Sequence, residues 1–155
     1  KIRNKLPNVG ISTDIIVGFP GETEDDFLNT ISVMEKVKFD SAFTFKYSPR
    51  KGTKALEYDD QVDENVKQKR LEKVISLQKS HTIFRNQCFI GNIENILIEK
   101  ESKRNSSKWA GRTDSNKWVI FEKANAKVKD IVPVLITQSK DITLHGKIIS
   151  KLKAA

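Results

Sequence analysis

The chain of 155 residues carries 28 Lys and Arg against 20 Asp and Glu, a formal net charge of +8, and 37% of its residues are hydrophobic. This composition excludes wholesale disorder, and the length allows one ordinary domain or two small ones. No apolar run approaches the roughly 20 residues that span a bilayer, and no basic-then-apolar leader opens the sequence. Because the chain starts at Lys1 rather than Met, we expect a cut piece of a longer protein.

The single cysteine excludes several kinds of site. Cys88 cannot form an intramolecular disulfide, and alone it cannot supply the thiolates of a zinc site or of an iron–sulfur cluster. Neither His81 nor His145 has a partner at catalytic spacing. We therefore predict no metal ligands and no catalytic residues in this chain, place Cys88 in a core, and expect a reducing compartment, the cytoplasm.

The first predicted element is a strand over residues 11–19. Its continuous run Ile15, Ile16 and Val17 favours a strand covered on both faces. Asp14 is then a buried carboxylate, which needs a partner.

A helix and a second strand follow. Thr23 and Asp26 form a capping box, and apolar residues at helical spacing predict a helix over residues 24–38. The next strand covers residues 42–47, and the crossover is long enough for the two strands to pair in parallel.

Asp63 is the predicted N-cap of a long helix that ends near residue 86. Its predicted apolar face is imperfect and consists of Val66, Leu71, Val74, Ile75, Ile83 and Phe84. Beyond it, five short runs rich in β-branched and aromatic residues are separated by turn-forming residues, which favours a small OB-like barrel. We therefore predict an α/β part, residues 1–85, followed by an all-β part, residues 86–152. The predicted barrel strands cover residues 93–98, 108–113, 118–122, 131–137 and 143–149.

Positive charge is concentrated in the second half of the chain. Residues 1–84 hold 14 basic and 13 acidic residues, whereas residues 85–155 hold 14 and 7, a net charge of +7. This asymmetry indicates a polyanion-binding module beside a nearly neutral part. A lysine-rich surface without a partner is the alternative.

The barrel part also supplies the two kinds of side chain that bind RNA loops, aromatic faces and cations. We expect Trp109 to be exposed and Phe121 to lie in the barrel core. Arg112 can fork onto a phosphate or stack on a base. The candidate RNA-binding residues are Lys103, Arg104, Lys108, Trp109, Arg112, Asn116, Lys117 and Trp118.

The junction between the first strand and its helix is a candidate ligand site, because ligands of α/β folds bind at the carboxyl ends of strands. Gly18 and Gly21 carry no side chain, so a flat ring can approach the backbone there. Ile16 and Val17 offer apolar surface to such a ring. The alternative is an ordinary turn whose glycines serve only the geometry of the backbone.

Three strings of residues carry a family resemblance. Residues 13–23 (TDIIVGFPGET) and 43–53 (FTFKYSPRKGT) resemble successive late strands of the barrel of MiaB-type tRNA methylthiotransferases, which are radical S-adenosylmethionine (SAM) enzymes. Residues 110–121 (AGRTDSNKWVIF) resemble the TRAM domain of these enzymes. The resemblance implies the last strand–helix units of a partial (βα) barrel, then a five-stranded OB-like TRAM barrel. It also implies that Ile16, Val17 and Gly18 border the adenine of SAM, with Tyr47 and Ser48 nearby.

That family methylthiolates C2 of N6-isopentenyladenosine next to the tRNA anticodon, using SAM and two [4Fe–4S] clusters. Because Cys88 stands alone, the resemblance implies a C-terminal portion that is inactive and holds no cofactor by itself. Its implied partners are a tRNA anticodon stem-loop and the missing N-terminal and cluster-binding regions, with no membrane. Two alternatives are a fragment of the methylthiotransferase that modifies an aspartate of a ribosomal protein, and a non-catalytic TRAM or OB-like RNA-binding module.

Overall fold

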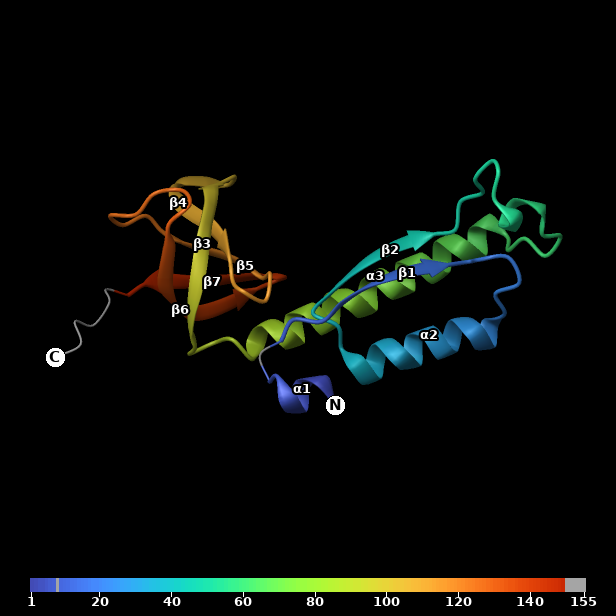
Figure 1. Ribbon diagram of the computed structural model, residues 1–155, viewed down its shortest axis with the longest axis horizontal. Helices are drawn as coiled ribbons and strands as arrows, with labels where there is room; N and C mark the ends of the chain where they lie inside the picture. Colours follow the sequence, from blue (N-terminus) through green and yellow to red (C-terminus); the bar gives the residue numbers. More distant parts are fainter. Residues whose placement is uncertain (8, 150–155) are drawn as a thin grey trace. The chain divides into compact units, whose positions relative to one another are not determined.

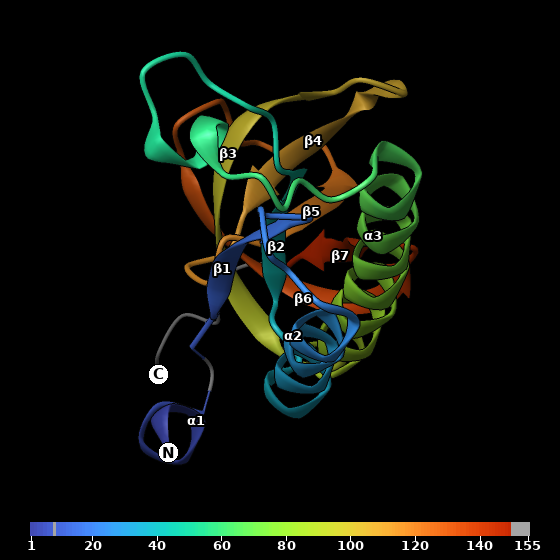
Figure 2. The ribbon, with the colours of Figure 1, turned by 90° about the vertical axis from the view of Figure 1, so that its right-hand side faces the viewer.

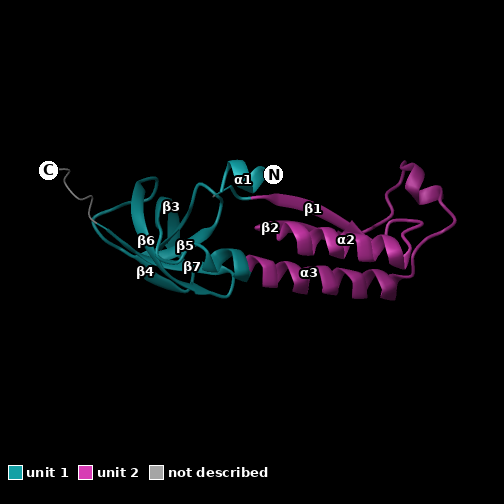
Figure 3. Ribbon diagram, turned by 90° about the horizontal axis from the view of Figure 1, so that it is seen from below, with its two compact units in different colours: residues 1–10, 83–155 teal, residues 11–82 magenta. Residues whose placement is uncertain are grey.

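The computed structural model describes residues 1–7 and 9–149, so residues 150–152 of the predicted barrel domain lie outside the described residues. The chain divides into two compact units, one of residues 11–82 and one that joins residues 1–10 to the chain from residue 83 onward (Figure 3). In chain order the elements are α1 (Ile2–Lys5), β1 (Ser12–Val17), α2 (Glu24–Val37), β2 (Ser41–Lys46), the 3₁₀ helix η1 (Lys54–Glu57), α3 (Glu64–Gln87), β3 (Ile93–Ser102), β4 (Asn105–Arg112), β5 (Trp118–Glu122), β6 (Ile131–Lys140) and β7 (Thr143–Ile148) (Figure 1).

The unit of residues 11–82 is the predicted strand–helix–strand arrangement with a long helix added. β1 and β2 pair in parallel, with Ser12 opposite Ser41 and Val17 opposite Lys46. Helices α2 and α3 cover one side of this two-stranded sheet (Figure 2). Their shared apolar core consists of Ile15, Val17, Phe27, Ile31, Met34 and Val74.

The prediction that β1 is covered on both faces is wrong for this structure. Ile15 and Val17 point into the core, but Ile16 is 55% exposed and Asp14 is exposed. Successive side chains of a strand point to opposite faces, and both helices lie on the same face. The expected burial of Asp14 is therefore wrong as well.

Both predicted helix starts are confirmed. The Thr23 side chain accepts a hydrogen bond from the Asp26 N–H, and the Asp26 carboxylate accepts one from the Thr23 N–H. The Asp63 carboxylate accepts from the Asn65 N–H at 2.8 Å, as an N-cap does. These local signals depend only on residues within one turn, so the sequence displays them directly.

The packing face of α3 differs from the predicted apolar one. Val66, Ile75 and Phe84 are exposed, and among the predicted apolar residues only Val74 is fully buried. Up to residue 82, the buried positions of α3 follow the helical repeat but are mostly polar: Lys67, Arg70, Val74, Gln78 and His81. Long polar side chains can cover apolar surface with their stems while their ends find partners, and apolar periodicity does not detect such a face.

The second unit contains the predicted five-stranded barrel, and the expected fold class is confirmed. The strands close in the order β3-β4-β5-β7-β6, and β3 pairs with β6. All pairs are antiparallel except β5 with β7. Phe121 is 1% exposed and lies in the barrel core, as predicted. The other buried core residues are Phe89, Ile96, Ile98, Val119, Val134, Ile136 and Leu144.

Cys88 does not occupy the core position predicted for it. It is exposed in the turn after α3, with its Sγ 3.7 Å from the Phe84 carbonyl oxygen. The neighbouring Phe89 is the side chain that enters the barrel core.

The two histidines give the chain a predictable pH dependence. Burial first, and neighbouring lysines second, lower the pKa of both His81 and His145. The folded state therefore favours the neutral rings, whereas the unfolded chain binds protons near the ordinary pKa of about 6.5. We expect the free energy of unfolding to be highest above about pH 7 and to fall as the pH drops through about 6.5.

Urea unfolding at about pH 7.5 and about pH 5.5 measures this effect. The stability lost between the two pH values is expected to be smaller in the double variant His81→Gln/His145→Gln than in the wild type. An equal loss in both proteins would assign the pH dependence to carboxylates instead.

Candidate cofactor edge and nucleic-acid interface

The five residues predicted to border a cofactor lie together where β1 and β2 end. The Tyr47 N–H donates to the Val17 carbonyl at 2.8 Å, so the two strands stay joined beyond the last residue of β2. Ile16 and Ser48 are exposed, Tyr47 is half-buried, and Val17 and Gly18 are buried. The carboxyl edge of the sheet thus places exposed apolar surface beside backbone that is out of contact with water.

Gly18 serves the geometry of the turn. Its φ is +71°, and its N–H donates to the Glu22 carboxylate at 2.5 Å. A Cβ at this position would overlap the stem of Lys67. The space beside the Gly18 Cα is therefore filled by the protein itself, and its N–H already has an acceptor.

An aromatic cluster surrounds the same edge. The ring of Phe19 meets the rings of Tyr47 and Tyr58 edge-on, at centroid distances of 5.2 and 6.5 Å. The buried Lys67 places its Nζ 5.4 Å from the centre of the Tyr47 ring. The Tyr47 hydroxyl is buried without a hydrogen-bond partner. Apolar surface, aromatic rings and an unpaired hydroxyl fit the edge of a flat heterocycle such as adenine.

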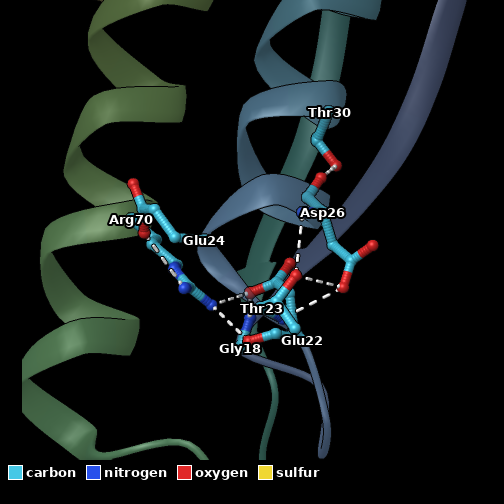
Figure 4. Close-up of polar contacts among 7 residues, drawn as sticks. All are labelled: Gly18, Glu22, Thr23, Glu24, Asp26, Thr30 and Arg70. Carbon is cyan, nitrogen blue, oxygen red and sulfur yellow. Dashed lines mark hydrogen bonds and ion pairs between the residues drawn. The ribbon is translucent and has the colours of Figure 1, made fainter.

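The turn between β1 and α2 is fastened to α3 by Arg70 (Figure 4). The Arg70 Nη1 donates to the Glu22 carboxylate at 2.6 Å and to the Glu22 carbonyl at 3.0 Å, while Nη2 donates to Glu24 at 3.1 Å. The Arg70 and Glu22 side chains are 8% and 10% exposed, whereas that of Glu24 is 64% exposed. The guanidinium also lies 5.2 Å from the centre of the Phe27 ring.

Arg70, Lys67 and Glu22 also belong to this edge and were not among the residues predicted for it. The only available signal was the spacing of polar residues on α3, which repeats every three or four positions like a buried face. Among residues 1–7 and 9–149, no group of three or more His, Cys, Asp or Glu side chains could hold a metal ion. The described residues therefore do not fit an iron–sulfur cluster.

On the barrel, three predicted RNA-binding residues come together. The guanidinium of Arg112 lies 4.3 Å from the centre of the Trp118 ring and donates to the Asn116 side chain. Glu99 holds the Arg112 Nε at 3.3 Å, and the Lys100 Nζ lies 4.6 Å from the Trp118 ring. We call Glu99, Lys100, Arg112, Asn116 and Trp118 the Arg112 cluster.

A second pairing of cation and indole involves Trp109. The Lys123 Nζ lies 4.2 Å from the centre of the Trp109 ring. The same Nζ pairs with the Glu101 carboxylate at 2.5 Å. Trp109 is half-buried and packs against the barrel core, so the expectation that it is exposed is wrong. Its β4 neighbour Lys108 pairs with Glu122 at 2.8 Å.

The other predicted cations lie in different surroundings. Lys117 is only 6% exposed, with its Nζ 5.7 Å from the Phe89 ring, because its side chain turns toward the barrel interior. The structure therefore does not place Lys117 on the surface where it was predicted. Lys103 and Arg104 are exposed in the turn between β3 and β4.

Comparison with known proteins identifies the class of the barrel. Residues 87–149 match the TRAM domain, so the closed barrel is a TRAM domain. No helix among the described residues combines the length and the apolar composition that crossing a membrane requires.

Nearly the whole chain is similar to enzymes named tRNA-2-methylthio-N(6)-dimethylallyladenosine synthase. The identity is 44% over 149 residues with the synthase of Fusobacterium nucleatum and 48% over 149 residues with that of Carboxydothermus hydrogenoformans. It is 44% over 153 residues with that of Thermoanaerobacter sp. strain X514. These matches cover 96%, 96% and 99% of this chain, but only 34%, 34% and 32% of the three relatives. The chain thus spans about a third of their length, and the resemblance seen in its motifs is confirmed.

Proposed function

We propose that this chain is part of a tRNA methylthiotransferase that modifies N6-isopentenyladenosine beside the anticodon. The observation that carries the proposal is the similarity over 96–99% of the chain to three synthases of that name, with a TRAM barrel at residues 87–149. The names of these relatives specify a tRNA product, which favours this reading over a ribosomal-protein modifying enzyme. The proposed compartment is the cytoplasm.

In this proposal the carboxyl edge of β1 and β2 borders the adenine of SAM. Ile16 offers exposed apolar surface, and Val17 and Gly18 provide the backbone beside it. The Tyr47 hydroxyl, buried without a partner, is available to a polar edge of the ring, and Ser48 follows on the surface. SAM supplies the methyl group and the radical chemistry when it is bound together with clusters held by other parts of the enzyme. The residues of this edge would bind and orient the cofactor.

The TRAM barrel is proposed to bind the anticodon stem-loop through the Arg112 cluster. The guanidinium stacked on Trp118 presents a flat cation, which can stack on a splayed base or pair with a phosphate. Asn116 and Glu99 hold this guanidinium in place before RNA arrives. Exposed Lys103 and Arg104 would add phosphate contacts, and Lys108 and Trp109 would lie at the margin of the surface.

We expect Arg112→Ala to weaken binding of an anticodon stem-loop about tenfold, within the roughly 1–3 kcal/mol assigned to one base stack. If Arg112 also contacts a phosphate, the slope of log K against log salt should fall by about 0.7. Glu99→Gln is expected to strengthen binding, because the glutamine oxygen can still hold the guanidinium but no longer carries a negative charge that competes with phosphate. Fluorescence anisotropy at several salt concentrations measures all three quantities.

Lys36→Ala is the matched control, since it also removes one exposed cation but lies on α2, outside the barrel. It should leave both the affinity and the salt dependence unchanged. Equal losses for Arg112→Ala and Lys36→Ala would mean that only overall charge matters, and the Arg112 cluster would then not be the interface.

A further inference from the structure

The Glu22 carboxylate connects three segments of the unit of residues 11–82. One of its oxygens, Oε2, accepts hydrogen bonds from the Gly18 N–H at the end of β1 and from Arg70 Nη1 on α3 (Figure 4). Glu22 itself lies just before α2, and its N–H donates to the Phe19 carbonyl at 2.9 Å. The shape of the turn after β1 is therefore tied to the position of Arg70.

The turn needs such a restraint because its backbone is intrinsically free. Gly18 and Gly21 both have positive φ, at +71° and +81°. Glycine loses more conformational freedom on folding than any other residue. A single capping hydrogen bond would leave alternative turn conformations accessible, whereas the Arg70 fork also fixes the Glu22 carbonyl and the Glu24 side chain.

Stability alone does not account for a buried ion pair at this place. Removing two charges from water is costly, and packed apolar residues of similar volume often serve a core equally well. Arginine, in contrast, offers several donors in one rigid plane, which lysine does not. The fork therefore supplies geometry, and the geometry it fixes is that of Val17 and Gly18 at the candidate cofactor edge.

We propose that Arg70 is a positioning residue for the cofactor: through Glu22 it holds the β1–α2 turn in the shape that receives the adenine of SAM, without touching SAM itself. This inference rests on the proposed function. It assigns a role to the polar face of α3, whose buried Val74 packs into the core of the same unit.

The test uses the full-length enzyme with reconstituted clusters, and SAM as the probe in calorimetry. The variants are Arg70→Lys, which keeps the charge but loses the fork, and Glu22→Gln/Arg70→Gln, which leaves no buried charge unpaired. Groups that hold metal ligands in place are typically worth about 10–100-fold in metal affinity or activity, and we take the lower end of that range as the expected size of the effect here. We expect the dissociation constant for SAM to rise about tenfold in the double variant and by less in Arg70→Lys. The KM for SAM should rise while kcat at saturating SAM and the affinity for RNA are retained.

A second readout requires no cofactor. Hydrogen exchange of the Gly18 amide, measured by NMR in the 155-residue chain, should be about tenfold faster in the double variant, since the bond that protects it loses its anchor. Asp25→Asn is the matched control, because it removes an exposed carboxylate from the first turn of α2 that is not a partner of Arg70. It should change the SAM affinity less than about twofold, well below the effect of a supporting partner.

The outcomes separate the two proposals. If the wild-type enzyme binds no SAM, the proposed function fails and this inference fails with it. If the wild type binds SAM and the double variant binds it equally well, Arg70 has no positioning role, although the proposed function stands. If kcat, RNA affinity and helix content fall together with SAM affinity, the ion pair is only structural and the inference is overturned.

Discussion

Phe121→Ala is expected to lower the free energy of unfolding of the TRAM barrel by about 3–5 kcal/mol, the usual cost of truncating a buried aromatic residue. Phe121 is 1% exposed and packs with seven other buried residues in a core closed by five strands. A closed barrel cannot collapse easily into the cavity, so the cost should lie within this range. The barrel strands hold both tryptophans of the chain, Trp109 and Trp118, so their fluorescence during urea unfolding reports on the barrel.

Phe43→Ala is the control for the same chemical change at an exposed site. Phe43 is 65% exposed on β2, and surface truncations usually change stability by about 0.5 kcal/mol or less. A small effect of Phe121→Ala, comparable to that of Phe43→Ala, would contradict the packing described for the barrel.

Arg70→Met is expected to lower the free energy of unfolding by about 3–5 kcal/mol, because it leaves the Glu22 carboxylate buried without its counter-charge. Methionine fills much of the volume of arginine and tolerates irregular packing, so the loss should come from the charge rather than from a cavity. The double variant Glu22→Gln/Arg70→Met removes the unpaired charge and should recover most of the stability.

Far-UV circular dichroism during urea unfolding follows this comparison, since α2 and α3 contribute most of the described helix. The single variant should be clearly less stable than the double variant. If the two are equally unstable, the loss arises from packing around Phe27 and not from the buried carboxylate.

The sequence predicted those parts of the structure that depend on neighbouring residues. The Thr23–Asp26 capping box, the Asp63 cap and the strands around Phe121 are visible because a turn of helix or a strand shows its pattern within a few positions. Five runs of strand-forming residues also predicted the barrel correctly, and the resemblance of residues 110–121 predicted its class.

The errors concern side chains whose surroundings are set by distant segments. Ile16 and Asp14 were expected to be buried, but the sheet has helices on one face only. Lysine is usually a surface residue, yet the side chain of Lys117 turns toward Phe89. Arg70 was not recognised because its partner, Glu22, lies 48 positions away, so the polar spacing on α3 does not reveal which residue pairs with it.

The place of β7 in the barrel has a consequence for the order in which the protein folds during synthesis. β7 lies between β5 and β6, so two of the five strand pairs of the barrel require residues 143–148. The ribosome must therefore release almost the last described residues before the barrel can close. Residues 11–82, in contrast, contain β1, β2, α2 and most of α3. They can therefore pack together while the barrel is still being translated. Residues 1–10 group with the barrel, with Gly10 against Ser115, so this segment cannot reach its final place until residues far beyond residue 82 have been made.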